Sequence, residues 1–180
     1  MSKVSGRSIE SYSMYEKLCE CKEYLTKFGG HPMAAGLSLE EENVERFRRK
    51  LNEQSGLTEE DLVEKVTIDV PMPIHYIRKD LVQELSLLEP FGKGNEKPLF
   101  AQKNLWISQM RVFGKNRNVV KMRLTDENGY PMDGVYFGNG DEFAEEGRGK
   151  RKISIVYYPD INMYQGRESL QVIIRHYQFD

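Results

Sequence analysis

Residues 29 to 31 form a short segment whose residue types suit the binding of an anion. Gly29 and Gly30 stand directly before His31. Two glycines let the backbone approach a ligand closely with exposed amide groups. A histidine beside them can donate a hydrogen bond to a phosphate oxygen or orient a water molecule. The other interpretation is a helix C-cap followed by a packed histidine, and the pattern alone leaves both open.

A second polar segment lies near the N-terminus. Ser5, Gly6 and Arg7 place a hydroxyl, a flexible glycine and a guanidinium in consecutive positions. This combination suits a terminal phosphate, because arginine can bind two phosphate oxygens at once. The alternative is a solvated N-terminal arm with no ligand.

The second half of the chain interleaves basic and aromatic residues. The basic positions are Arg111, Lys115, Arg117, Lys121, Arg123 and Arg167, and the aromatic positions are Phe113, Tyr136, Phe137, Tyr157, Tyr158 and Tyr164. Such a pattern is typical of surfaces that bind single-stranded nucleic acid, where cations contact phosphates and flat rings stack on bases. The alternative is a small barrel whose rings are mostly core and whose basic face is solvated. The choice depends on strand register, because a shift of one residue moves every side chain to the other face.

The sequence shows no catalytic centre. Asp61, Asp69 and Asp80 are scattered, and no histidine lies within helical reach of any of them. Cys19, Cys21 and His31 fall short of a tetrahedral metal site, and cysteines two apart on a helix diverge. We assign no role to His75 or His176. We therefore expect no catalytic residue, metal site or cofactor in this chain.

The elements that position these residues differ between the two halves. Before residue 99, helical periodicity alternates with short extended pieces. It predicts helices over 14–28, 40–53 and 78–88, strands over 34–39 and 64–70, and a Gly/Pro-rich loop over 89–98 that marks a domain boundary. The 14–28 helix would end at Gly29.

After residue 98 the pattern becomes that of β-strands. Val120, Met122 and Leu124 alternate with polar residues, and Asn128-Gly129 and Gln165-Gly166 are turn signals. Strands are expected over 105–113, 120–125, 130–137, 153–158 and 170–179. Five strands in about 80 residues with little helix between them suggest a small closed or partly open barrel.

Composition narrows the class of protein. The 180 residues carry a net charge of −2, divided as −5 over residues 1–96 and +3 over residues 97–180. No apolar run approaches the roughly 20 residues that a membrane span needs, and the N-terminus has no apolar signal core. The two cysteines are badly spaced for a disulfide. We expect a soluble, reduced, cytoplasmic protein with no membrane association.

Several stretches together resemble the RecJ family of single-strand-specific DNA exonucleases. SGRSIESYSMYEKLCECKEYLTKFGGHPMAAGLSL is similar to the second half of the family's DHH-associated domain, and LEPFGKGNEKPLF to the segment that leads into its OB-fold. DGVYFG and DINMYQGRESLQVII resemble late OB strands. The resemblance implies an α+β fold, with a partial α/β DHH-associated domain over 1–70, a linker with a short helix over 71–98, and an all-β OB-fold barrel over 99–180.

The resemblance also implies a function. Family members degrade single-stranded DNA from the 5′ end in DNA repair and recombination, with Mn²⁺ or Mg²⁺ held in a DHH domain that is absent from this chain. Ser5, Gly6 and Arg7 match residues that hold the 5′-phosphate, and Gly29, Gly30 and His31 match a motif facing the catalytic cleft. We expect a monomeric, substrate-binding portion that is inactive alone. Its expected partners are single-stranded DNA, the missing domain and a single-strand-binding protein. The alternative is an OB-type protein-interaction module that does not bind nucleic acid.

Overall fold

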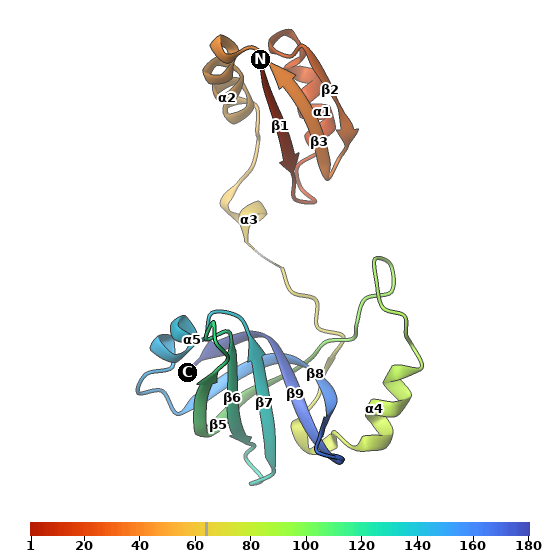
Figure 1. The fold of residues 1–180 in the computed structure, drawn as a ribbon, viewed down its shortest axis with the longest axis vertical. Coiled ribbons are helices and arrows are strands. Elements are labelled where there is room, and N and C mark those ends of the chain that lie inside the picture. The colour runs from red at the N-terminus through yellow and green to blue at the C-terminus, as the bar shows by residue number, and fades with distance from the viewer. Residues whose placement is uncertain (64) are drawn as a thin grey trace. The chain divides into compact units, whose positions relative to one another are not determined.

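The computed structural model describes residues 1–63 and 65–180, which form two compact units (Figure 1). The first unit is Met1–Lys65 and the second is Val66–Asp180. Both mix helix and strand, which confirms the α+β class. No helix in the described residues is both long enough and apolar enough to span a bilayer.

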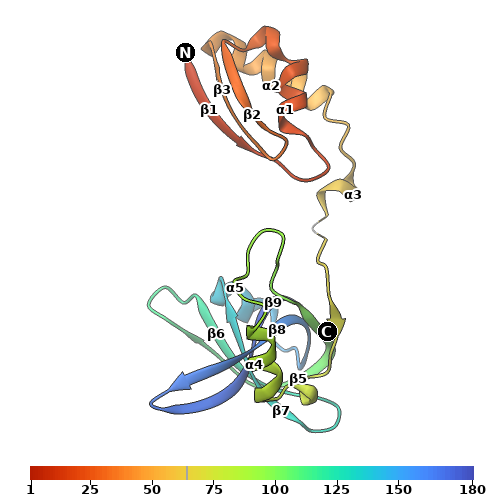
Figure 2. The same cartoon turned by 90° about the vertical axis from the view of Figure 1, so that its right-hand side faces the viewer.

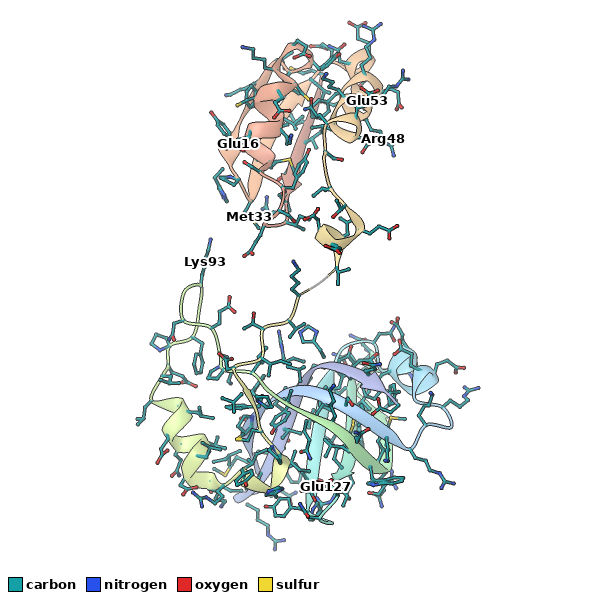
Figure 3. All side chains as sticks on the ribbon, turned by 180° about the vertical axis from the view of Figure 1, so that it is seen from behind. Glu16, Met33, Arg48, Glu53, Lys93 and Glu127 are labelled. Carbon is teal, nitrogen blue, oxygen red and sulfur yellow. The ribbon has the colours of Figure 1, made fainter. Side chains whose placement is uncertain are left out.

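The first unit is a three-stranded antiparallel sheet in the order β1-β3-β2. Its elements are β1 (Ser2–Arg7), α1 (Met14–Glu20), η1 (Lys22–Tyr24), β2 (Lys27–His31), β3 (Ala34–Leu39), η2 (Glu41–Asn43), α2 (Val44–Glu53) and α3 (Glu59–Leu62). Figure 2 shows α1 and α2 on the same face of the sheet. Exposed side chains such as Arg48 and Glu53 on α2 point away from it (Figure 3).

The core of this unit lies between the sheet and the two helices. Leu37 and Leu39 of β3 pack with Leu18 of α1 and Phe47 of α2, and all four are buried. Alternate residues of β3 enter this core, so Gly36 and Ser38 lie on the opposite face. The predicted strand over 34–39 and helix over 40–53 are confirmed, although the first turn of that helix is 3₁₀.

Two predictions for the first 70 residues are wrong, and one alternative is excluded. The helix expected over 14–28 ends at Glu20, and the glycines at 29 and 30 lie inside β2 rather than at a C-cap. Thr26 donates both its amide and its hydroxyl to the carbonyl of Ser38, which begins strand pairing in place of helix. The strand expected over 64–70 is reduced to β4 (Val70–Pro71), and Glu64 lies outside the described residues. The solvated arm at the N-terminus is in fact strand β1.

The second unit is built on a closed five-stranded barrel. Its elements are β4, η3 (Ile74–Tyr76), α4 (Lys79–Ser86), β5 (Phe100–Phe113), β6 (Val119–Thr125), β7 (Pro131–Phe137), α5 (Gly140–Glu146), β8 (Lys152–Tyr164) and β9 (Arg167–Phe179). Strands follow the order β5-β6-β7-β9-β8, and β8 pairs back to β5. β7 and β9 run parallel, and α5 connects β7 to β8. This is the Greek-key connection of an OB-fold.

Turn chemistry accounts for the hairpins. Gln165 and Gly166 both have positive φ, 49° and 73°, in the two-residue turn that joins Tyr164 to Arg167. That is the type I′ geometry that matches strand twist. Gly129, with φ of 78°, completes the turn between β6 and β7. The five predicted strands, both turn signals and the 78–88 helix are confirmed, whereas α5 was not predicted from the sequence.

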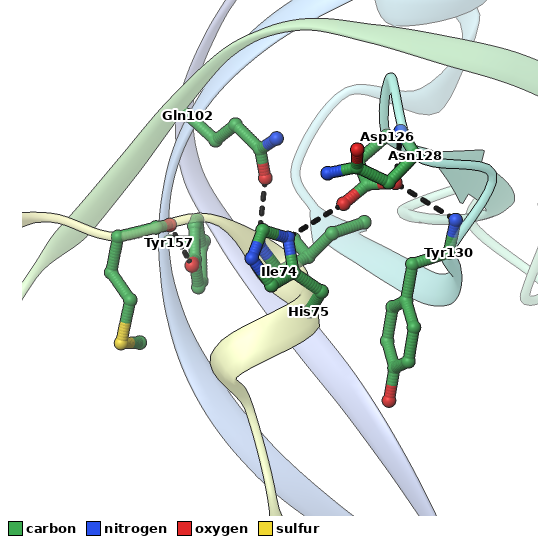
Figure 4. Close-up of polar contacts among 8 residues, drawn as sticks. Ile74, His75, Gln102, Asp126, Asn128, Tyr130 and Tyr157 are labelled. Carbon is green, nitrogen blue, oxygen red and sulfur yellow. Dashed lines mark hydrogen bonds and ion pairs between the residues drawn. The ribbon is translucent and has the colours of Figure 1, made fainter.

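The segment that precedes β5 closes one end of the barrel. Ile74 and Ile77 are fully buried in the barrel core, although the sequence places them in an expected linker over 71–98. The amide of Ile74 donates to Oε1 of Gln102 at 2.7 Å (Figure 4). Nδ1 of His75 lies 2.8 Å from Oδ2 of Asp126, whose side chain is wholly buried. The same view draws this contact as a dashed line. Hydrogen bonds and apolar burial therefore both attach this segment to the barrel.

Candidate functional site: two basic faces

A groove with a volume of about 490 Å³ lies on the outer surface of the barrel. Arg111 of β5 lies opposite Lys121 of β6, and Gln109 lies opposite Arg123. Their neighbours Met122 and Leu124 point inward to the core. The wall is completed by Phe113, Asp133, Asn162, Ser169 and Gln171. Strand alternation thus brings three of the predicted basic residues together on one face.

The cations of this groove differ in how they are neutralised. Nη1 of Arg123 lies 2.6 Å from Oδ1 of Asp133, in a half-exposed ion pair. Among the residues that the structure describes, neither Arg111 nor Lys121 has a carboxylate within salt-bridge distance. Nζ of Lys121 lies 5.9 Å from the ring centroid of Phe113. Lys121 and Arg111 are therefore available to an external anion.

Two outward aromatic residues lie in a cross-strand row at one end of the groove. Phe113 of β5, Val119 of β6 and Phe137 of β7 form one cross-strand row. The rings of Phe113 and Phe137 are 44% and 60% exposed. This end offers flat apolar surface beside the free cations, which is the combination that unpaired bases and their phosphates require.

Two tyrosines predicted to contact DNA are placed elsewhere. Tyr157 is fully buried, and its hydroxyl donates to the carbonyl of Met72 at 2.6 Å. Burial raises the pKa of Tyr157 far above its ordinary value. Tyr136 packs inward, with its ring centroid 4.8 Å from that of Phe143. The assignment of Tyr157 is wrong, because its ring is buried in the barrel core and cannot stack on a base. Tyr136 is partly buried and packs its ring against that core, on the side of β7 away from the groove.

The hairpin between β8 and β9 extends the groove. Tyr164, 67% exposed, pairs with Arg167 across the turn. Both residues line a second hollow of about 430 Å³ that shares Lys121, Asn162 and Ser169 with the first. The structure therefore brings Tyr164 and Arg167 to the same surface as Arg111 and Lys121.

The remaining predicted cations lie in the turn between β5 and β6. Arg117 is bound to Asp141 of α5 at 2.6 Å, which lowers the pKa of the Asp141 carboxyl. The same hydrogen bond raises the pKa of the Arg117 guanidinium. Lys115 is exposed in the turn. Arg117 thus fixes the turn against α5.

Among the exposed aromatic residues that the sequence interpretation missed, one lies on a barrel strand. Trp106, the single tryptophan, is 46% exposed on β5, and Nζ of Lys152 lies 4.5 Å from its ring centroid. Its exposure could have been predicted from the apolar Leu105 before it, which is buried, because neighbouring strand residues face opposite sides of the sheet.

The other candidate residues of the sequence lie on the first unit's sheet. Arg7 of β1 and His31 of β2 both pair with Ala34 of β3, and we call these three residues the arginine row. Ser5 and Gly29 both pair with Gly36, and we call these three the glycine row. Both rows face away from the helices. Nη1 of Arg7 donates to Oγ of Ser5 at 3.4 Å.

The other two glycines of these motifs lie on the helix-facing side. A Cβ on Gly6 would lie 3.1 Å from Cε of Met14. A Cβ on Gly30, whose φ is 154°, would lie 2.3 Å from the Ala34 carbonyl oxygen. Packing therefore requires glycine at position 30, where the contact is backbone, whereas at position 6 the contact is the flexible end of the Met14 side chain. A Cβ on Gly29 would meet nothing within 4 Å.

The donor set does not fit a divalent metal. The described residues contain no group of three or more His, Cys, Asp or Glu side chains placed to ligate one ion. The buried carboxylate of Asp126 already accepts from His75 and from the amides of Asn128 and Tyr130. Cys21 is buried and accepts from Nε2 of Gln54, and burial raises the pKa of its thiol.

Comparison with known proteins finds a matching family model for each of the two units. The family model described as the RecJ OB domain matches residues 68–176, and the DHHA1 domain model matches residues 2–56. The chain is 37% identical to the single-stranded-DNA-specific exonuclease RecJ of Bacillus subtilis, across 97% of this chain and 22% of that protein. It is 33% identical to the Escherichia coli RecJ exonuclease, across 96% of this chain and 30% of that protein. The chain thus spans less than a third of these relatives.

Solved structures confirm the fold. The crystal structure of Thermus thermophilus RecJ in complex with Mg²⁺ superposes with a TM-score of 0.79 at 23% identity, covering 98% of this chain and 26% of that one. The Mn²⁺ complex of the same protein gives the same TM-score.

Proposed function

The chain belongs to the RecJ family, and from this premise we propose that it is the part of a single-strand-specific 5′→3′ exonuclease that holds the DNA. The barrel groove binds the backbone and bases of a single strand, and the open face of the first unit's sheet holds its 5′-phosphate. The metal that performs hydrolysis is supplied from outside these 180 residues. We place the enzyme in DNA repair and recombination in the cytoplasm.

The observation that carries the proposal is the groove lined by Arg111, Lys121 and Phe113, with the exposed ring of Phe137 in the same cross-strand row as Phe113. Nζ of Lys121 lies 5.9 Å from the ring centroid of Phe113, so a free cation stands close to exposed aromatic surface. A duplex buries its base faces, so only a single strand can use both features. The groove therefore selects unpaired DNA through stacking and holds it through charge.

Fluorescence anisotropy with labelled oligothymidine tests the groove. Each phosphate contact in a single strand contributes about 0.7 to the slope of log affinity against log salt. Changing both Arg111 and Lys121 to Ala should lower that slope by about 1.4 and weaken binding. The matched control changes the exposed Arg148 and Lys150 beside α5 to Ala, and it should leave both quantities nearly unchanged. Equal effects of the two double variants would contradict the groove.

Two further outcomes bear on the proposal. Absence of binding at low salt would favour the alternative of a protein-interaction module. We expect the isolated chain to release no mononucleotides from 5′-phosphorylated single-stranded DNA in Mn²⁺, because its donor set does not fit the metal. Metal-dependent release of mononucleotides would refute the proposal that the hydrolytic metal is supplied from outside these residues.

A further inference from the structure

A third row continues the open face of the first unit's sheet. Lys3 of β1 and Lys27 of β2 both pair with Ser38 of β3. These three residues, which we call the lysine row, lie two positions along each strand from the glycine row. They face the same side, because side chains two apart on a strand point the same way. Both lysines are exposed.

The charge on this face differs from that of the unit around it. Residues 1–65 contain 10 basic and 13 acidic side chains, so the unit as a whole is acidic. The three rows nevertheless hold Lys3, Lys27, Arg7 and His31, and no carboxylate. Segregation of cations onto one face of an acidic unit indicates an anionic ligand there.

The shape of the face suits a backbone that lies flat on it. A shallow hollow of about 420 Å³ is lined by residues of the lysine and glycine rows and by the cross-strand row between them: Lys3, Lys27, Ser38, Gly29, Gly36, Val4, Phe28 and Leu37. A Cβ on Gly29 or Gly36 would meet no atom within 4 Å, so the glycine row is an open floor between the two charged rows. A ligand can therefore cross from the arginine row to the lysine row over Gly29 and Gly36, beside the Ser5 hydroxyl.

The spacing of the rows matches that of a nucleotide chain. Successive rows are two strand residues apart, which is about 6.8 Å. One nucleotide and two amino-acid residues contain the same number of backbone bonds, so an extended single strand advances by about the same distance per phosphate. Three rows therefore correspond to three consecutive phosphates.

We propose that the lysine row binds the third phosphate of a single strand whose 5′-phosphate lies at the arginine row. The strand then runs along β3 from Ala34 towards Ser38, with its second phosphate over the glycine row. Lys3 and Lys27 contact the third phosphate from either side, and the Ser38 hydroxyl donates to it. This inference rests on the proposed function, because it takes the position of the 5′ end from there.

The test compares 5′-phosphorylated thymidine dinucleotide and trinucleotide, which carry two and three phosphates. Binding to the full chain is followed by NMR through the amide signals of Ala34 and Ser38, which report this sheet separately from the barrel. The unchanged chain should bind the trinucleotide more tightly than the dinucleotide. Changing Lys3 and Lys27 to Ala should weaken trinucleotide binding about fivefold, as expected for exposed ion pairs, and leave dinucleotide binding unchanged.

Two controls separate this inference from the proposed function. Changing Lys22 and Arg48 to Ala removes the same charge from exposed positions in η1 and α2, and should affect neither probe. Changing Arg7 to Ala should weaken both probes. If Arg7→Ala weakens both probes and the lysine variant weakens neither, the lysine row is overturned and the phosphate site stands. If neither variant changes binding, both are overturned. Equal affinity of the unchanged chain for the two probes also overturns the lysine row.

Discussion

The ring of Tyr136 stacks on Phe143 in the barrel core, with centroids 4.8 Å apart, while the next residue along the strand points into solvent. Tyr136 also meets Tyr177 edge-on at 5.2 Å. Adjacent aromatic residues of β7 therefore serve different purposes. Tyr136 stabilises the barrel, and Phe137 offers a free face beside the groove.

This relationship predicts opposite effects of two alanine substitutions. Phe137→Ala should weaken oligothymidine binding by about 1 kcal/mol or more, since stacking on a base contributes about 1–3 kcal/mol, and should hardly change stability. Tyr136→Ala should lower the free energy of unfolding by about 3 kcal/mol, because it opens a cavity in the aromatic cluster. Anisotropy titration and chemical denaturation measure the two quantities. Loss of stability with Phe137→Ala and none with Tyr136→Ala would show that the register is wrong.

A carboxylate in the groove should oppose DNA binding. Asp133 pairs with Arg123 at 2.6 Å and stands among the cations that face the ligand. Asp133→Asn should tighten oligothymidine binding about two- to fivefold at low salt, because it frees Arg123 and removes a repelling charge. Asp141→Asn is the matched control. Asp141 pairs with Arg117 at the same distance of 2.6 Å, and this pair lies outside the groove. An equal gain from both variants would reflect net charge alone.

The buried carboxyl of Asp126, which is hydrogen-bonded to His75, should make the free energy of unfolding depend on pH in the acid range. Burial of Asp126 opposes ionisation, but hydrogen bonds from the Tyr130 amide, His75 and the Asn128 amide outweigh it, and the pKa of this carboxyl is lowered. A lowered pKa in the folded state contributes stability above the unfolded value, near pH 4, which is lost as pH falls through the folded value.

Denaturation at several pH values checks this expectation. The free energy of unfolding should decline below about pH 4. Asp126→Asn should reduce it by about 1–3 kcal/mol at pH 7, because the amide leaves the buried donors poorly satisfied, and should flatten the decline at low pH. An unchanged acid profile in that variant would assign the decline to other carboxylates.

The sequence carried enough information for the strands but not for the direction of their side chains. Val120, Met122 and Leu124 alternate without interruption, and β6 forms as expected. In β5 the register shifts between Ile107 and Gln109, so the face that holds Leu105 is not the face that holds Arg111. A bulge of this kind depends on pairing with another strand, and the chain's own pattern does not reveal it.

The helix expected over 14–28 failed for a related reason. Leu25 and Phe28 satisfy helical spacing, but they satisfy equally well a short turn followed by a strand. Phe28 lies opposite Leu37 of β3 and packs on the core of the first unit. Pairing with β3 decides between the helix and the strand. The pairing of β1 and β2 with β3 also brings Arg7 and His31 into one row.

The two glycines of the Gly29-Gly30-His31 motif should respond differently to alanine. In Gly30→Ala the new Cβ would lie 2.3 Å from a backbone oxygen at a φ of 154°, so we expect a loss of about 2–4 kcal/mol in the free energy of unfolding. Gly29→Ala places its Cβ in open space and should change stability by no more than about 0.5 kcal/mol. Gly29→Ala should instead weaken binding of the 5′-phosphorylated trinucleotide, because the added methyl group projects into the space where we place the second phosphate. If Gly29→Ala destabilises the fold as much as Gly30→Ala does, the motif is structural throughout and the open face loses its place in phosphate binding.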